Sequence, residues 1–152
     1  MEFPRIATNK DYALFFIRLI LAIVIFPHGA QKLLGWFGGY GFSGTMSYFT
    51  QTREMPWLVG FLVILIEFFV PLALLTGLAT RFCSAALACV MAGIIFTTFS
   101  NYFFMDWFGK QKTEGYEFFL LAIGMSVALV LAGPGRLSLD ARLSGQQNAA
   151  TR

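Results

Sequence analysis

The chain has 152 residues, of which 57% are hydrophobic and 12% charged, and its mean hydropathy is +0.68. Soluble domains usually carry about 25% charged residues, so this composition excludes an ordinary soluble domain and predicts one compact polytopic membrane domain. The net charge is +3 and the basic residues are scattered along the chain, which gives nucleic-acid binding no support.

The first apolar run follows a polar start (residues 1–11) and extends over about 12–34. A bilayer core of about 30 Å needs roughly 20 apolar residues to cross it, and no small-x-small cleavage site follows this run. The run therefore predicts a retained first transmembrane helix. Pro27 lies in its last third and should kink it.

Three further apolar runs follow, separated by two aromatic connections at 35–56 and 101–113. Gly-rich turns open the first connection, and GPGR at 133–136 ends the last run with strong helix breakers. The fold class predicted is an all-α membrane protein, an antiparallel four-transmembrane-helix bundle with long aromatic outer loops. The predicted domain is 1–143, with helices at about 12–34, 57–78, 82–99 and 114–131 and a disordered polar tail at 144–152.

Four helices place both termini on one side of the membrane. That side holds six basic residues and the opposite side four, namely Arg5, Lys10, Arg81, Arg136, Arg142 and Arg152 against Lys32, Arg53, Lys110 and Lys112. Because basic loops favour the cytoplasm, this bias predicts cytoplasmic termini. All three tryptophans then lie at the outer interface.

The two cysteines and the single histidine limit which cofactors the chain could bind. Cys83 and Cys89 are six residues apart and fall on opposite sides of a helix, so they cannot pair with each other. One histidine, His28, excludes a bis-histidine haem or a multi-histidine zinc site within one chain. The sequence has no recognisable metal, haem or flavin motif.

The deepest charges are Arg18 in the first helix and Glu67 in the second. A charge costs about 2.5–3.5 kcal/mol at the centre of a membrane helix even on insertion scales, so both side chains should face the protein interior. Counting 1.5 Å per residue puts them within about 7 Å in depth. We therefore predict an Arg18–Glu67 ion pair, which either fixes helix register or holds a polar headgroup.

A second polar group is expected in the outer third of the membrane. His28, Gln31 and Lys32 lie there on the first helix, and Glu117 lies at the same depth on the fourth. A histidine beside a carboxylate can accept and pass on protons, so His28 and Glu117 are candidate catalytic residues. The other interpretation is a set of ordinary interfacial residues, with Lys32 reaching the headgroups.

The aromatic loops above this polar group are either a binding lid or plain interfacial loops. Trp36, Trp107 and Tyr116 are the side chains in or beside them that could form flat walls for a ring-shaped ligand. Together with Arg18, Gln31, Lys32 and Glu67, they complete the predicted ligand-binding set.

Four stretches of the chain form a recognisable pattern: RLILAIVIFPHGAQKLLGWFGGYGFSGT (18–45), IEFFVPLALLTGLATR (66–81), GYEFFLL (115–121) and GPGRLSLD (133–140). The most specific part is P-H-G-x-Q-K-x-x-G-W-F at 27–37. With these stretches the chain resembles the DoxX family of small four-helix membrane proteins. The resemblance implies a four-helix bundle in the bacterial cytoplasmic membrane and a relation to the membrane subunits of thiosulfate:quinone oxidoreductase. It carries the family's polar positions onto Arg18, His28, Gln31, Lys32, Glu67 and Glu117.

The first functional hypothesis is thus a quinone-interacting membrane subunit of an oxidoreductase assembly, with the headgroup near His28 and Glu117. Lys32 or Arg18 would stabilise a reduced anionic oxygen. The alternatives are a non-enzymatic scaffold that docks partner proteins through its loops, and a small channel or transporter. Membrane lipid is an expected contact, and a protein partner or a homo-oligomer is also expected.

Overall fold

Four apolar helices form the body of the protein in this computed structural model, which describes residues 10–98, 102–106, 108–109, 115–135 and 137–150. They are α1 (Lys10–Leu34), α3 (Trp57–Thr76), α4 (Thr80–Thr98) and α5 (Glu117–Ala132). The connection from α1 to α3 contains η1 (Trp36–Gly38), α2 (Gly41–Ser47) and η2 (Tyr48–Thr52), and the chain closes with α6 (Leu139–Ala150).

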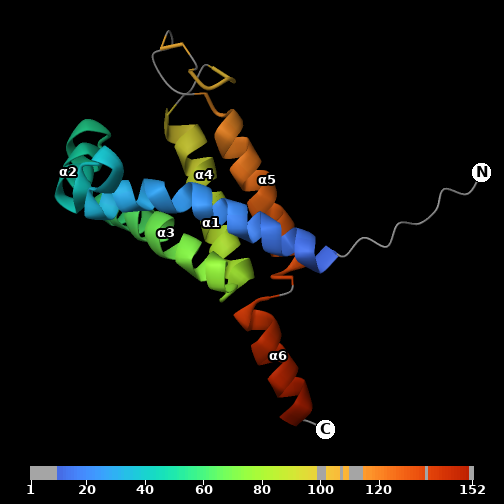
Figure 1. The fold of residues 1–152 in the computed structure, drawn as a ribbon. Helices are drawn as coiled ribbons and strands as arrows, with labels where there is room; N and C mark the ends of the chain where they lie inside the picture. Colours follow the sequence, from blue (N-terminus) through green and yellow to red (C-terminus); the bar gives the residue numbers. More distant parts are fainter. Residues whose placement is uncertain (1–9, 99–101, 107, 110–114, 136, 151–152) are drawn as a thin grey trace, which may run out of the picture.

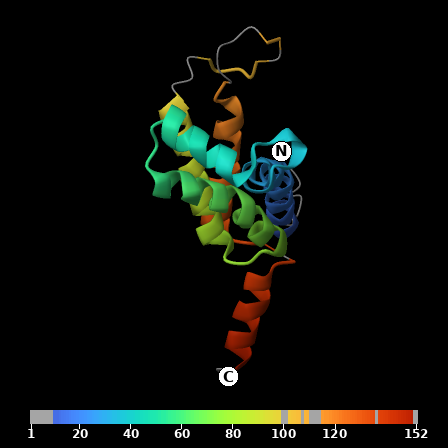
Figure 2. The same ribbon diagram turned by 90° about the vertical axis from the view of Figure 1, so that its left-hand side faces the viewer.

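The four long helices pack as two pairs. Figure 1 shows α1 and α3 side by side with opposite chain directions, and α4 beside α5 in the same relation. The two pairs cross rather than run parallel, as the turned view in Figure 2 also shows. The buried apolar core joins them, because Leu21 and Ile25 of α1 belong to one cluster with Leu87 of α4 and Leu129 of α5.

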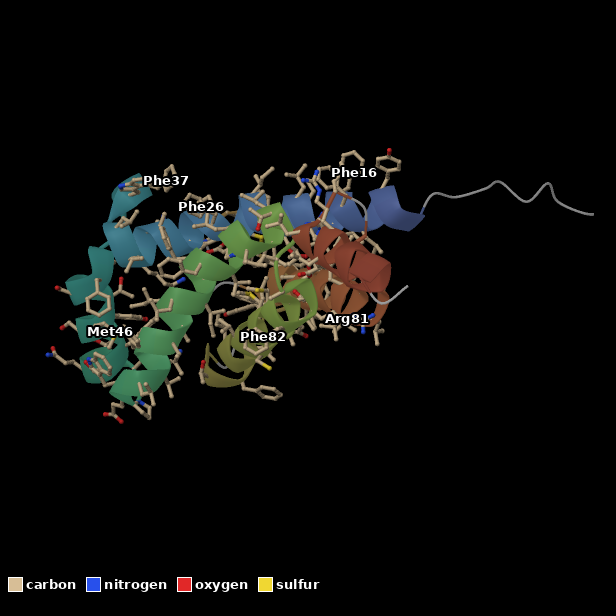
Figure 3. All side chains as sticks on the ribbon, turned by 90° about the horizontal axis from the view of Figure 1, so that it is seen from below. Phe16, Phe26, Phe37, Met46, Arg81 and Phe82 are labelled. Atoms are coloured by element: carbon tan, nitrogen blue, oxygen red, sulfur yellow. The ribbon has the colours of Figure 1, made fainter. Side chains whose placement is uncertain are left out.

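Three of these helices are long and apolar enough to cross a membrane by length and composition: Tyr12–Leu34, Trp57–Thr76 and Thr80–Thr97. The fourth, α5, is apolar but has 16 residues, about 24 Å at 1.5 Å per residue. Many large apolar side chains are exposed, and Figure 3 shows Phe16, Phe37 and Phe82 pointing away from the helices. Such an apolar exterior suits lipid rather than water, so the expectation of an all-helical membrane protein is met.

The α1–α3 pair is tight because a glycine stands where the helices meet. A Cβ atom at Gly29 would overlap the backbone carbonyl of Glu67, so only a hydrogen fits there. Small residues at a crossing let two membrane helices approach closely. This contact fixes the register of α1 against α3.

At the end of the molecule where α3 stops and α6 begins, here called the α6 end, a buried arginine ties three segments together. The Arg18 side chain is 1% exposed. It donates hydrogen bonds to the carbonyls of Leu74 at 3.1 Å and Leu137 at 3.0 Å. Gly77, with φ +68°, leaves room for the guanidinium, since a Cβ atom there would overlap it.

The predicted Arg18–Glu67 ion pair is therefore wrong. The Glu67 carboxylate pairs with Lys32, and Arg18 reaches the carbonyls at the α6 end instead. Counting residues from the ends of the apolar runs gave only a coarse depth, whereas the Gly29 contact sets the true register and brings Lys32, one turn further along α1, next to Glu67.

Helix α6 lies where the sequence predicts a disordered tail from residue 144, and Figures 1 and 2 show it projecting away from the four apolar helices. Ser138 caps it, because its hydroxyl accepts a hydrogen bond from the Ala141 N–H at 3.1 Å. Asp140, in its first turn, accepts bonds from the backbone N–H groups of Ala79 at 2.7 Å and Thr80 at 2.8 Å. Ser138 therefore starts α6, and Asp140 attaches it to the start of α4. The polar composition of this stretch does not indicate either contact.

Candidate functional site

A cavity of about 790 Å³ lies between the two helix pairs. Residues of α1, η2, α3, α4 and α5 line it, and most of these residues are aliphatic or aromatic. Its volume falls within the roughly 300–1,000 Å³ typical of small-molecule sites, which are mostly apolar with a few placed polar groups.

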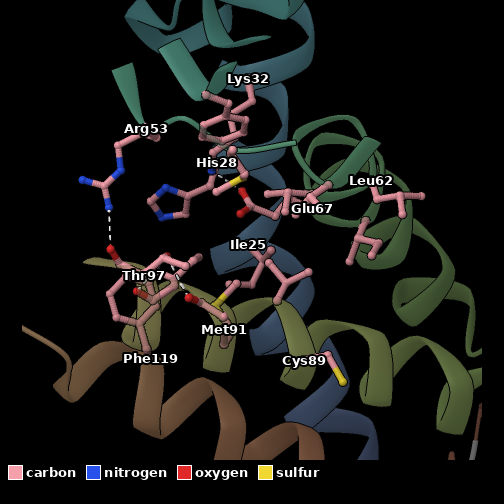
Figure 4. Close-up of a pocket in the computed structure, with 18 of the residues that line it drawn as sticks. Ile25, His28, Lys32, Arg53, Leu62, Glu67, Cys89, Met91, Thr97 and Phe119 are labelled. Atoms are coloured by element: carbon pink, nitrogen blue, oxygen red, sulfur yellow. Dashed lines mark hydrogen bonds and ion pairs between the residues drawn. The ribbon is translucent and has the colours of Figure 1, made fainter. Parts of the chain in front are cut away.

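The Lys32–Glu67 ion pair forms one polar wall of this cavity (Figure 4). The Lys32 side chain is partly exposed, whereas the Glu67 side chain is almost completely buried. A buried carboxylate needs a partner, since an isolated charge in an apolar interior is very costly. The pair exists because the Gly29 contact seats α1 directly on α3 at Glu67.

Only one oxygen of the Glu67 carboxylate is used by the described residues. Oε2 accepts from the Lys32 ammonium, whereas Oε1 is buried and has no hydrogen-bond partner among the described residues. An ionised carboxylate accepts hydrogen bonds through both oxygens and donates none. Oε1 is thus an unpaired acceptor with almost no accessible surface of its own.

His28 stands beside this ion pair, one helical turn before Lys32 on α1. Its ring is exposed, lines the cavity and lies 6.0 Å from the ring of Phe118, centroid to centroid. In the view of Figure 4 the imidazole lies between the Arg53 guanidinium and the Glu67 carboxylate. An imidazole in that place can donate or accept a hydrogen bond toward the cavity.

A second polar wall comes from residues that the sequence did not single out. Arg53 follows η2, lines the cavity and donates to the Thr97 carbonyl of α4 at 3.0 Å. Tyr48 and Thr97 line the cavity as well. A single arginine in a polar loop is common, so Arg53 gives no functional signal in the sequence. No local sequence pattern indicates that this loop packs against α4.

Two of the predicted polar residues, Gln31 and Glu117, do not line the cavity and bind backbone groups of the connections. The Gln31 amide donates to the Phe37 carbonyl at 3.3 Å, which holds the turn after α1. The Glu117 carboxylate accepts the Met105 N–H at 2.9 Å, which holds the connection before α5. The cavity lining thus includes His28, Lys32 and Glu67 of the predicted polar residues. Arg18 does not line the cavity either.

Two of the three aromatic residues expected as ligand walls, Trp36 and Tyr116, do not line the cavity. Trp36 is exposed on η1 and packs edge-on against Phe37. Tyr116 packs edge-on against Phe103 with ring centroids 5.2 Å apart. Trp107 lies outside the described residues. The aromatic wall of the cavity is formed instead by Tyr48, Phe49, Phe118 and Phe119.

The cavity, its ion pair and the helices around it define a class, a small polytopic membrane protein with a site between its helices. The model of the DoxX family matches residues 13–100, which is more than half of the chain and includes His28, Lys32, Arg53 and Glu67. The chain belongs to the DoxX family. Searches of curated proteins and of solved structures returned no match.

Proposed function

We propose that this chain is the quinone-binding membrane subunit of an oxidoreductase assembly and that the quinone occupies the cavity between the helix pairs. The observation that carries the proposal is the combination of a large apolar cavity with an imidazole and an ion pair on its wall. A quinone has the same two parts, an apolar ring and tail and polar ring oxygens. The apolar lining suits the former and the polar wall suits the latter.

In this proposal His28, Lys32 and Glu67 act on the ring oxygens. Lys32 is a fixed donor that stabilises negative charge developing on an oxygen. His28 exchanges a proton with the same ring, a role for which imidazole is well suited. Glu67 replaces Glu117 as the carboxylate of the site and orients Lys32. The quinone, when bound, supplies two-electron redox chemistry, and the electrons come from a partner protein or a small donor.

The same proposal includes the placement of the chain in the cell. The four apolar helices cross the bacterial inner membrane as two antiparallel pairs, with both termini in the cytoplasm. The oxidoreductase role further requires a protein partner or a second copy of the chain. The composition and the exposed apolar side chains support the membrane part of this proposal.

A variant that fills the cavity tests the proposal. Gly93 lines the cavity and Gly124 of α5 does not, and a Cβ atom at either position meets nothing within 4 Å. We expect Gly93→Leu to lose quinone that co-purifies with the wild type in mild detergent, and the matched variant Gly124→Leu to retain it. Mass spectrometry of the extracted lipids is the measurement. Absence of quinone from the wild type, or equal amounts in both variants, contradicts the proposal.

The imidazole is tested separately. His28→Ala leaves the apolar lining in place and removes the group that exchanges protons. We expect it to abolish quinone reduction by the assembly while the purified chain elutes and unfolds as the wild type does. Full activity in this variant would show that the site is elsewhere.

A scaffold role is the second candidate function, because several aromatic side chains are exposed together after α1. Trp36, Phe37 and Tyr40 stand out from the turn after α1, with Tyr40 85% exposed. Aromatic residues are enriched at protein interfaces. A scaffold predicts that Tyr40→Ala removes a partner in pull-down experiments and that His28→Ala does not.

A further inference from the structure

We infer that the cavity opens sideways to the lipid between α3 and α4, and that the apolar tail of the bound quinone lies in this opening. The lateral opening is bordered by Val59 and Leu62 of α3 and by Cys89 and Gly93 of α4. The inference rests on the proposed function and deepens it, because it states where the ligand enters and which segments contact its tail.

The outer face of α3 reaches the edge of the cavity. Leu58, Leu62 and Phe69 are exposed and lie on one face of α3, because spacings of four and seven residues nearly complete whole helical turns. Leu58 and Phe69 do not line the cavity, whereas Leu62 does. Leu62 therefore belongs both to the apolar exterior of the protein and to the cavity wall.

The outer face of α4 meets the cavity in the same way. Phe82, Cys89 and Phe96 are exposed on one face of this helix, and neither phenylalanine lines the cavity, whereas Cys89 does. Gly93 lies on the same face and also lines the cavity. A Cβ atom at Gly93 would meet nothing within 4 Å, so no neighbouring side chain closes the cavity at this point.

The lateral opening lies where α3 and α4 are far from the short turn that joins them. The two helices diverge from this turn in Figure 1, and Leu62 and Gly93 each lie about 20 Å from it along their helices at 1.5 Å per residue. Both helices are long and apolar enough to cross a membrane. Since the exposed side chains beside the opening are apolar, lipid rather than water suits its outer side.

A polar edge lies on the other side of the cavity. In Figure 4, Arg53 and Thr97 lie on one side of the view, and Leu62 and Cys89 lie on the other. A tail that left the cavity past the Arg53 guanidinium would remove water from a charged group, which is costly. A quinone therefore fits best with its ring at the polar wall and its tail between α3 and α4.

A spin label on Cys89 tests the opening without any ligand. Cys89 is exposed and Cys83 is buried, so a thiol-specific nitroxide attaches to Cys89. The labelled full chain is placed in phospholipid nanodiscs, and its collisions with oxygen and with a water-soluble nickel chelate are compared by electron paramagnetic resonance. We expect collisions with oxygen to dominate, because oxygen concentrates in lipid and the chelate stays in water. Dominant collisions with the chelate overturn the inference.

The matched control places the same label at an exposed position outside the cavity. Glu54→Cys, combined with Cys89→Ser, carries the label in the polar connection before α3. We expect collisions with the chelate to dominate at this position. The same oxygen preference at both positions would mean that the label at Cys89 does not report an opening to lipid, and the inference would fall.

A quinone with a photoreactive tail tests the position of the ligand. A fully substituted benzoquinone with a diazirine in the middle of a ten-carbon tail is bound to the chain in nanodiscs and illuminated. Mass spectrometry of the peptides then locates the adducts, with and without an excess of the unmodified quinone. We expect the adducts that the excess suppresses to lie mainly at residues 58–62 and 89–93. Suppressible adducts confined to residues 48–53 overturn the inference.

The possible failures are distinguishable. If the suppressible adducts lie away from α3 and α4, the quinone site stands and only the inference falls. If the excess quinone suppresses no adduct, the proposed function falls, and the assignment of the tail falls with it. Should oxygen nevertheless dominate at Cys89 in that case, the opening to lipid stands without a quinone.

Discussion

At the scale of single residues, Gly29 determines which charged side chains form an ion pair between α1 and α3. Its missing side chain lets α1 touch the Glu67 backbone, and this contact brings Lys32 to the Glu67 carboxylate. Both the Lys32–Glu67 ion pair and the position of His28 depend on Gly29 having no side chain beyond a hydrogen atom where the two helices cross. Gly29 therefore belongs to the site although it touches no ligand.

Gly29→Val should destabilise the protein. The added carbon atoms overlap the α3 backbone, which must move, and overpacking of this kind costs about 1–3 kcal/mol or more. We expect a lower thermal unfolding temperature in detergent. Gly124→Val is the matched control, since a Cβ atom there meets nothing within 4 Å. Equal unfolding temperatures for the two variants would contradict a tight crossing at Gly29.

The sequence identified part of this site and missed the rest for physical reasons. His28, Lys32 and Glu67 stood out because polar side chains are costly inside apolar runs. The partner of Glu67 was predicted wrongly, because a count of residues along each helix gives an approximate depth but not the register between two helices. Arg53 gave no signal, since the packing of its loop on α4 depends on contacts distant in sequence.

At the scale of elements, the end of α3 and the start of α4 are each held by another segment. The backbone N–H groups of Ala79 and Thr80 at the start of α4 donate to Asp140 of α6. The Leu74 carbonyl near the end of α3 accepts a hydrogen bond from Arg18 of α1. The apolar runs predict several helices and an all-helical class. They do not predict α6, because its start depends on Ser138 and on a cap shared with a helix about 60 residues earlier.

Asp140→Ala should weaken the attachment of α6 to α4. It removes the acceptor of two backbone N–H groups, and the loss of one helix cap usually costs about 0.5–2 kcal/mol. We expect a lower unfolding temperature and faster hydrogen exchange of the amides at residues 79–80. Leu143→Ala, a change at an exposed position of the same helix, is the control and should leave this exchange unchanged. Identical exchange in both variants would exclude the shared cap.

At the scale of the whole molecule, the two helix pairs form the main walls of the cavity. The pairs cross, and their packing leaves about 790 Å³ between them. Local patterns in the sequence set each helix, but the space between pairs depends on the crossing of all four. A cavity of this kind is consequently not predictable from periodicity, although its polar residues are partly recognisable.

Removal of residues 137–152 should destabilise the molecule more than Asp140→Ala does. The truncation deletes the Leu137 carbonyl that accepts from Arg18 as well as the cap on α4. We expect poor recovery of folded protein in detergent or a clearly lower unfolding temperature. Truncation after Ser144 keeps both contacts and should behave as the wild type. If removal of residues 137–152 has as little effect as truncation after Ser144, the contacts at the α6 end do not stabilise the fold.

The bond between Arg18 and Leu137 joins residues 119 positions apart, and this separation sets an order of events during biosynthesis. The first helix leaves the ribosome with its arginine long before the carbonyl that will receive it has been made. Final closure of the α6 end must wait until translation is nearly complete. A product shortened before residue 137 by a premature stop codon would contain Arg18 but not the Leu137 carbonyl, and membrane quality-control proteases would encounter the protein with the α6 end incomplete.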